Sequence, residues 1–188
     1  MHKFILFEGL DRTGKSTIAE KIAKLLDAKL LHSPPEVLVP FRKYFDTLDN
    51  TTNFSYYLTA NQILDFKISE YLKKQNVVCD RYYPTTAAYH SAKLNKNMNF
   101  ILDTVRTKPD RIYYLTANPE ILDKRATDTN SVNDRFHGID LWRKVSKNYD
   151  KIFLHNPSVL RIDTTNKTEK EVLQIVLDDL KTKYKYAF

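Results

Sequence analysis

The stretch FEGLDRTGKST, residues 7–17, decides how this chain folds. It holds Gly9 and Gly14, two of only three glycines in the 188-residue sequence, and Lys15 and Ser16 follow the second glycine directly. Residues 9–16 match the phosphate-loop pattern G-x-x-x-x-G-K-[ST] in full. In such a loop the glycines let successive backbone N–H groups turn toward phosphate oxygens, while the lysine reaches the β- and γ-phosphates and the hydroxyl ligates Mg²⁺. The pattern predicts a site for a nucleoside triphosphate formed by Gly9, Leu10, Asp11, Arg12, Thr13, Gly14, Lys15, Ser16 and Thr17.

The residues on both sides of the loop support this interpretation. Residues 3–8, KFILFE, are a short apolar run typical of a buried parallel strand. From Lys15 onward, apolar residues recur at helical spacing: Ile18, Ile22, Leu25 and Leu26. A strand before and a helix after are the context that a phosphate loop requires. The pattern alone does not explain Asp11, an acid that should repel phosphate, or Arg12, a second cation beside Lys15.

The rest of the chain alternates predicted strands with predicted helices. Further strands are expected at 29–32, 76–80, 111–117 and 158–163. Helices are expected at 41–74 with an interruption at 49–52, and at 84–94, 99–107, 118–126, 139–153 and 169–183, while 127–138 is a polar, exposed loop. This alternation predicts one α/β domain over residues 1–188, a three-layer sandwich with helices on both faces of a parallel sheet. The ligand site of such a fold lies beyond the carboxyl ends of the strands.

Composition limits the classes of function. No apolar run reaches about 18 residues, so we expect no membrane-spanning helix. The N-terminus does not have the pattern of a signal peptide, and the single cysteine, Cys79, cannot form an internal disulfide; both favour a cytoplasmic location. The net charge is +7, from 30 basic and 23 acidic residues. Because the lysines are scattered, this charge favours a site for several phosphates over nucleic-acid binding.

A GTPase is excluded by the motifs that are missing. Residues 166–169, NKTE, come close to the guanine-specifying N-K-x-D but end in Glu169 instead of aspartate. No D-x-x-G follows the loop either, because the only later glycine, Gly138, has Arg135 three residues before it.

Residues 76–89, NVVCDRYYPTTAAY, carry the second chemical signal. Asp80 stands at the carboxyl end of an apolar strand, where a phosphate-loop fold places the carboxylate that holds the water shell of Mg²⁺. Arg81 follows directly and is expected to point into the same crevice. A strand-end ion pair is the alternative interpretation.

Four stretches together resemble the thymidylate kinases and related deoxynucleoside monophosphate kinases: FEGLDRTGKST (7–17), CDRYYPTTAAY (79–89), KPDRIYYL (108–115) and NPEILDKR (118–125). The resemblance covers nearly the whole chain. It implies a P-loop kinase fold with a five-stranded parallel sheet of order 2-3-1-4-5, a short lid at about 127–138, and a homodimer. It also implies transfer of the γ-phosphoryl of MgATP to a nucleoside monophosphate, dTMP or a related or modified pyrimidine deoxynucleotide, with a diphosphate and ADP as products.

The resemblance implies roles for individual residues. Arg12 is expected to stabilise the migrating phosphoryl group, and Asp11 either pairs with Arg12 or meets the sugar hydroxyl of the acceptor. Arg81 is expected to clamp the acceptor phosphate. The implied catalytic set is therefore Asp11, Arg12, Lys15 and Arg81. For the donor side, the resemblance implies that Ser16 and Asp80 hold the Mg²⁺ that accompanies ATP and that Arg125 lies on the adenine.

The sequence departs from the family pattern at the acceptor base. Residues 55–66 resemble a helix with an aromatic residue under the base and an arginine four residues later, but the chain has Leu58 and Gln62 there. Glutamine can both donate and accept, so Gln62 suits a thymine-like edge or a different base. Arg42 is the nearest substitute for a missing second phosphate-binding arginine, and His137 replaces an acid of the lid. The predicted acceptor set is Asp11, Arg42, Leu58, Gln62, Arg81, Thr85, Tyr89, Arg135 and Phe136.

Other functions stay open at this point. A deoxynucleoside kinase needs a general base for the 5′-hydroxyl, and Glu36 is the only candidate found. A polynucleotide 5′-kinase, or a nucleotide-binding module without turnover, would need a basic stripe and salt-sensitive binding to single strands.

Overall fold

The structure is a computed structural model, and it describes residues 2–127 and 138–186. Its centre is a five-stranded sheet of order β2-β3-β1-β4-β5 in which all neighbours are parallel, so the predicted order is confirmed. The strands are β1 (Phe4–Gly9), β2 (Lys29–His32), β3 (Val77–Asp80), β4 (Arg111–Thr116) and β5 (Val159–Asp163). The helices are α1 (Lys15–Leu25), α2 (Val39–Phe45), α3 (Asn50–Tyr71), α4 (Tyr83–Leu94), α5 (Pro119–Thr127), α6 (Ile139–Ile152) and α7 (Glu169–Tyr184).

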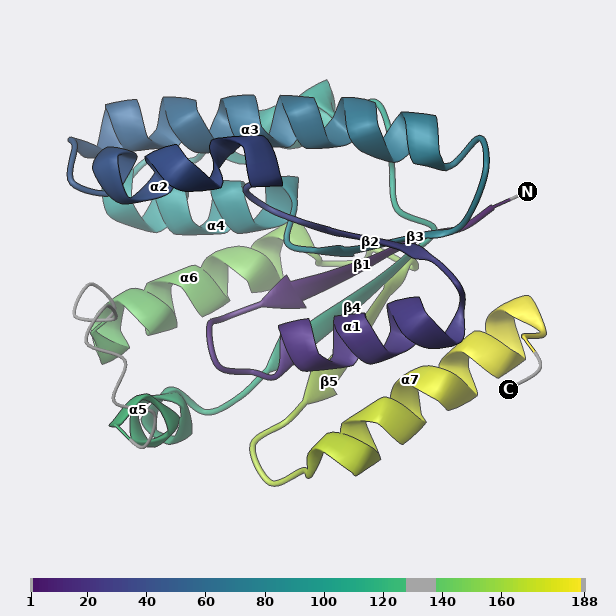
Figure 1. Ribbon diagram of the computed structural model, residues 1–188. Helices are drawn as coiled ribbons and strands as arrows, with labels where there is room; N and C mark the ends of the chain where they lie inside the picture. The colour runs from purple at the N-terminus through teal and green to yellow at the C-terminus, as the bar shows by residue number, and fades with distance from the viewer. Residues whose placement is uncertain (1, 128–137, 187–188) are drawn as a thin grey trace.

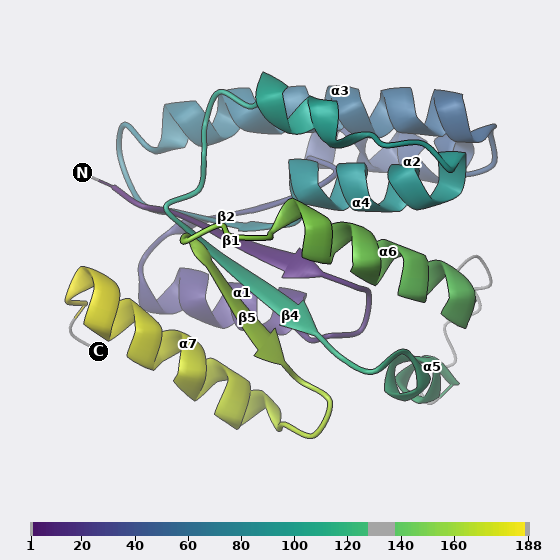
Figure 2. The ribbon, with the colours of Figure 1, turned by 180° about the vertical axis from the view of Figure 1, so that it is seen from behind.

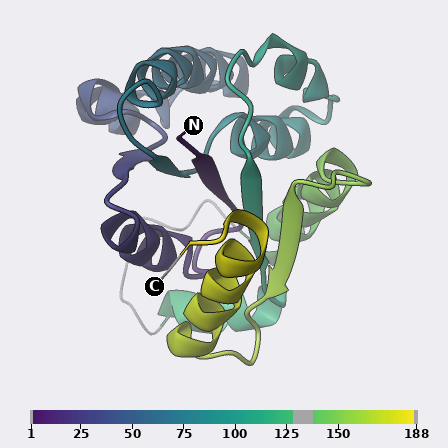
Figure 3. The same cartoon turned by 90° about the vertical axis from the view of Figure 1, so that its right-hand side faces the viewer.

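The two faces of the sheet are covered by different helices, as Figures 1 and 2 show from opposite sides. Side chains alternate along a strand, so Phe4 and Leu6 of β1 pack with α3, α4 and α6, whereas Ile5 and Phe7 pack with α1 and α7. Figure 3 shows the resulting three layers. Both faces are apolar because a parallel sheet is buried on both sides. Because all neighbours are parallel, the carboxyl ends of the five strands lie at the same edge of the sheet.

Two predicted helices differ from the observed ones. The expected break at 49–52 lies at 46–49 instead, because Asp49 caps α3 by accepting the backbone N–H groups of Thr51 and Thr52. The helix expected at 99–107 is a 3-10 turn, Asn99–Thr104. It ends there because the Asp65 carboxylate accepts the backbone N–H groups of residues 106 and 107 and draws them out of a helical path. A second 3-10 turn, Glu36–Leu38, precedes α2.

Within the described residues, no helix combines the length and the apolar character that crossing a bilayer requires.

Candidate active site

The phosphate loop joins β1 to α1 and depends on its two glycines. Gly9 has φ +137°, and a Cβ at this position would lie 2.0 Å from the carbonyl oxygen of Leu115 on the neighbouring strand β4. Gly14 has φ +88° and is the N-cap residue of α1. A side chain is thus excluded at Gly9 by space and disfavoured at both positions by the backbone conformation.

Lys15 lies inside the loop rather than on the surface. Its side chain is buried, and Nζ donates to the carbonyl oxygen of Leu10 at 2.5 Å. Thr13 Oγ1 donates to the same carbonyl at 2.9 Å. Burial, followed by the charge of Arg81, lowers the pKa of Lys15 to about 8. The loop therefore holds a desolvated cation that an anionic ligand would stabilise.

Asp80 and Ser16 form a pair with the character of a metal site. Ser16 Oγ donates to Asp80 Oδ2 at 2.5 Å, and His32 Nδ1 lies 3.8 Å from the same oxygen. Burial alone would raise the pKa of Asp80, but the neighbouring His32, the charges of Lys15 and Arg81 and the hydrogen bond from Ser16 lower it to about 2. Within the described part of the chain, Asp80 Oδ1 is buried and has no hydrogen-bond partner. A hydroxyl beside an ionised carboxylate with one unused oxygen suits a hydrated Mg²⁺.

Arg81 joins the phosphate loop to α4. Its Nη2 pairs with Asp11 Oδ1, and its Nη1 donates to the carbonyl oxygen of Gly9 at 3.1 Å and to Thr85 Oγ1 at 3.3 Å. Tyr89 OH donates to the other oxygen of Asp11 at 2.9 Å. The structure thus brings together four residues of the predicted acceptor set, Asp11, Arg81, Thr85 and Tyr89. Within this group Asp11 pairs with Arg81.

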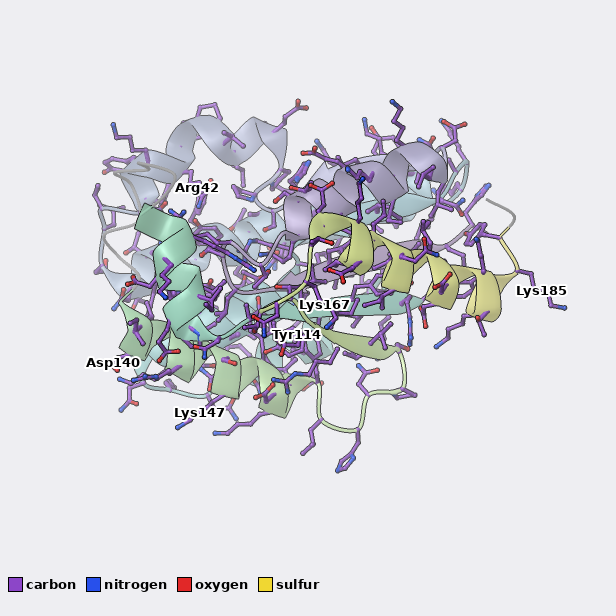
Figure 4. All side chains as sticks on the ribbon, turned by 90° about the horizontal axis from the view of Figure 1, so that it is seen from below. Arg42, Tyr114, Asp140, Lys147, Lys167 and Lys185 are labelled. Carbon is purple, nitrogen blue, oxygen red and sulfur yellow. The ribbon has the colours of Figure 1, made fainter. Side chains whose placement is uncertain are left out.

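The guanidinium groups of Arg12 and Arg125 each donate to the backbone carbonyl of the other residue, and we call this pair of hydrogen bonds the Arg12–Arg125 clasp. Arg12 Nη1 donates to the carbonyl oxygen of Arg125 at 2.8 Å, and Arg125 Nη1 donates to that of Arg12 at 3.1 Å. Arg125 Nη2 also donates to the carbonyl oxygen of Thr164, 2.9 Å away, just beyond β5. The clasp borders a pocket of about 240 Å³, lined by Arg12, Thr13, Gly14, Thr17, Ile18, Arg125, Thr164, Lys167, Glu169 and Val172. Figure 4 labels Lys167 in the connection between β5 and α7.

The remaining predicted acceptor residues lie on α2 and α3 or outside the described residues. Leu58 and Gln62 are four residues apart on α3, so they share a face; Leu58 packs partly on the core and Gln62 is exposed. Arg42 lies on α2, with Nε 3.5 Å from Asp46 Oδ2. Arg135, Phe136, His137 and most of the predicted lid fall outside the described residues.

A sequence model of the thymidylate kinase family matches residues 7–175 of this chain. A probable thymidylate kinase of Methanocaldococcus jannaschii is 33% identical, with 95% of each chain covered. This chain belongs to the thymidylate kinase family. A second relative, the thymidylate kinase of Plasmodium falciparum, is 30% identical over 96% of this chain and 91% of its own.

The fold of the family is confirmed independently of close sequence similarity. The structure of a thymidylate kinase from Candida albicans superposes with a TM-score of 0.82, covering 96% of this chain and 92% of that one at 23% identity. Membership of the thymidylate kinase family makes this chain a nucleotide-binding phosphotransferase, and the deoxynucleoside kinase alternative is not favoured.

Sequence reasoning missed Glu8 and part of the pocket wall of this thymidylate kinase-like site. Glu8 is fully buried at the end of β1, directly before the phosphate loop. Its carboxylate oxygens contact the Tyr82 N–H and the hydroxyls of Thr85 and Tyr149. Glu8 is the one charged residue in the apolar strand 4–9, and this position was the available signal. The pocket wall formed by Thr164 and Lys167 had no such signal, because it depends on where β5 ends.

Proposed function

We propose that this chain transfers the γ-phosphoryl group of ATP to dTMP, giving dTDP and ADP. The observation that carries the proposal is the contact that Asp11 of the phosphate loop makes with Arg81 and Tyr89. The loop is suited to a donor triphosphate, and an arginine held beside it is suited to the phosphate of a second nucleotide. A kinase that phosphorylates a nucleoside monophosphate needs both at the same edge of the sheet.

The donor end is proposed to bind ATP along the loop. Backbone N–H groups at residues 9–17 and the α1 N-terminus suit the phosphates, and Lys15 would exchange the Leu10 carbonyl for phosphate oxygens. The pocket at Arg125 and Lys167 is proposed to take the base. When bound, Mg²⁺ neutralises charge on the triphosphate, and Ser16 and Asp80 would hold it and its water.

The acceptor end is proposed to orient dTMP for attack. Arg81 is proposed to hold the acceptor phosphate, and Asp11 to meet the sugar hydroxyl. Arg12, at the centre of the loop, is proposed to leave the Arg125 carbonyl and stabilise the charge that develops on the transferred phosphoryl. Such an arginine contributes about 10³–10⁵ in rate in other phosphoryl transferases. Leu58 and Gln62 are proposed to face the base.

The wider biological setting belongs to the same proposal. We propose a single kinase domain with a lid at about 127–138, in a cytoplasmic homodimer. Exposed apolar side chains on α2 and α3, Phe41, Tyr44 and Phe66, support a contact between copies. Light scattering would measure the oligomeric state.

The proposal is tested with a panel of acceptors. Purified protein, ATP and Mg²⁺ are incubated with dTMP, dUMP, dCMP, dAMP, dGMP and thymidine, and products are separated by ion-exchange chromatography. dTDP is the expected main product. Phosphorylation of thymidine without any diphosphate would contradict the proposal and favour a nucleoside kinase that uses Glu36.

A further inference from the structure

Glu8 lies where three elements meet behind the phosphate loop. It belongs to β1 and points to the face that α4 and α6 cover. Its Oε1 accepts the backbone N–H of Tyr82 at 2.8 Å, and its Oε2 contacts Thr85 Oγ1 of α4 at 2.5 Å and Tyr149 OH of α6 at 2.9 Å. The side chain is entirely excluded from solvent. None of the roles proposed above uses it.

The geometry of these contacts requires a proton that the hydroxyls do not supply. Glu8 Oε2, Thr85 Oγ1 and Tyr149 OH are all within hydrogen-bond distance of one another, because the two hydroxyl oxygens are 2.7 Å apart. Three mutual contacts need three protons, and each hydroxyl brings one. The third proton belongs on the Glu8 carboxyl. With it, the three oxygens form a closed ring of hydrogen bonds.

The ring is connected to Arg81 by two routes. In the first route, Glu8 accepts the backbone N–H of Tyr82, the residue that directly follows Arg81. Arg81 itself has φ +71°, although it is not a glycine. Thr85 Oγ1, a member of the ring, accepts a hydrogen bond from Arg81 Nη1 at 3.3 Å. A residue with positive φ is kept there only when its surroundings specify it. Glu8 therefore acts on both the backbone and the guanidinium of Arg81.

We propose that Glu8, in its protonated form, is a positioning residue that closes a hydrogen-bond ring with Thr85 and Tyr149 and thereby holds Arg81 in place for the acceptor phosphate. This inference rests on the proposed function, since it concerns the acceptor of that same reaction. Tyr149 becomes a positioning residue by the same reasoning. Loss of the proton leaves the contact between Thr85 and Tyr149 without a hydrogen, and the ring opens.

The charged and titratable groups around Glu8 set the pH range of this effect. Burial raises the pKa of Glu8 to about 7, against the Thr85 hydrogen bond and the charge of Arg81. Lys15, Cys79 and Tyr149 are described titratable neighbours whose electrostatics also involve Glu8, and burial raises the pKa of both the Cys79 thiol and the Tyr149 hydroxyl. Glu8 consequently changes protonation near neutrality, and use of dTMP should weaken as the pH rises through that range.

The test compares two replacements of Glu8 in the full-length protein. Glu8→Gln keeps the shape of a neutral carboxyl and can donate to the ring, whereas Glu8→Ala removes it. We expect kcat/KM for dTMP to fall about 10–100-fold in Glu8→Ala through loss of Arg81 alignment. Glu8→Gln should stay within a few-fold of wild type and lose the part of the fall in kcat/KM that is centred near pH 7, while a fall at higher pH from Lys15 remains. KM for ATP should change less than KM for dTMP in both.

Two further variants keep the test decisive if Glu8→Ala does not fold. Tyr149→Phe removes one ring hydroxyl and should raise KM for dTMP. Asp179→Asn is the matched control, because this carboxylate of α7 accepts hydrogen bonds from Arg111 and Tyr113 on β4, away from the ring. It should lower stability without raising KM for dTMP. An unchanged pH profile in Glu8→Gln, or an unchanged KM in Tyr149→Phe, would overturn the inference.

An infrared measurement separates this inference from the proposed function. The carbonyl band of a protonated carboxyl should appear below neutral pH in wild-type protein and be absent from Glu8→Gln. A wild type that makes no dTDP would refute the proposed function, whatever the spectrum. An active wild type without the Glu8 band would refute the ring alone.

Discussion

Replacement of Glu8 by glutamine should change how the stability of the protein depends on pH. Burial raises the pKa of Glu8 from 4.5 to about 7 in the folded protein. A carboxyl with a raised pKa contributes stability that is fully present below the unfolded value of 4.5 and is lost as the pH rises to the folded value. Glutamine has no proton to lose, so the variant lacks this contribution to the pH dependence.

The size of the effect follows from the two pKa values. A shift of 2.5 units corresponds to about 3.4 kcal/mol at about 1.36 kcal/mol per unit. Between about pH 5 and pH 8, the linkage relation assigns about 2.5 kcal/mol of lost stability to Glu8. Burial lowers the pKa of His90 to about 4. Its contribution to the free energy of unfolding therefore rises by about 2 kcal/mol over the same pH interval. The wild-type curve is therefore nearly flat with respect to these two groups.

The assay must accordingly compare two proteins. Free energies of unfolding are measured by urea denaturation from about pH 5 to pH 8 in steps of about half a unit, with m-values checked for two-state behaviour. The value for Glu8→Gln minus that for wild type should rise by about 2.5 kcal/mol across this range. A difference that stays constant with pH would refute the reasoning, because it would mean that Glu8 is ionised throughout. His90→Gln should show the opposite trend relative to wild type.

Three further predictions concern the phosphate loop and its surroundings. Arg12→Ala should lower kcat by about 10³-fold or more in a coupled assay of ADP release, while calorimetry still detects ATP binding; equal activity would show that Arg12 does not stabilise the transferred group. Gly9→Ala should lower the free energy of unfolding by at least about 3 kcal/mol, because its Cβ would lie 2.0 Å from the Leu115 carbonyl oxygen; a fully stable variant would contradict the observed loop geometry. Asp80→Asn should raise the Mg²⁺ concentration needed for half-maximal rate by about tenfold, and an unchanged requirement would exclude Asp80 from the metal site.

The phosphate loop and the sheet could be predicted because their signals are local. The spacing of Gly9, Gly14 and Lys15 and the apolar runs on each side depend on neighbouring residues alone. The family pattern then supplied the strand order. Asp80 and Arg81 were predictable for the same reason, since they mark the end of a strand. The pairing of Arg81 with Asp11 was not, because the two residues are seventy positions apart and only the β1–β3 register brings them together.

The Glu8 ring and the Arg12–Arg125 clasp were out of reach of sequence reasoning for a physical reason. Each joins residues from three segments whose relative positions are set by packing of the whole sheet. The clasp also consists largely of bonds to backbone carbonyls, which every residue carries, so no residue type signals it.

The pocket beside the clasp has a consequence for synthesis of the chain. Its first wall, the phosphate loop, is complete after residue 17, but its last wall consists of residues 164–172 of a 188-residue protein. If this pocket takes the base of ATP, as proposed above, a partly synthesised chain has no complete nucleotide pocket, and ATP cannot stabilise it by mass action. Ligand protection begins only when β5 and the start of α7 have left the ribosome. Truncations before residue 172 should consequently be equally susceptible to proteolysis with and without nucleotide.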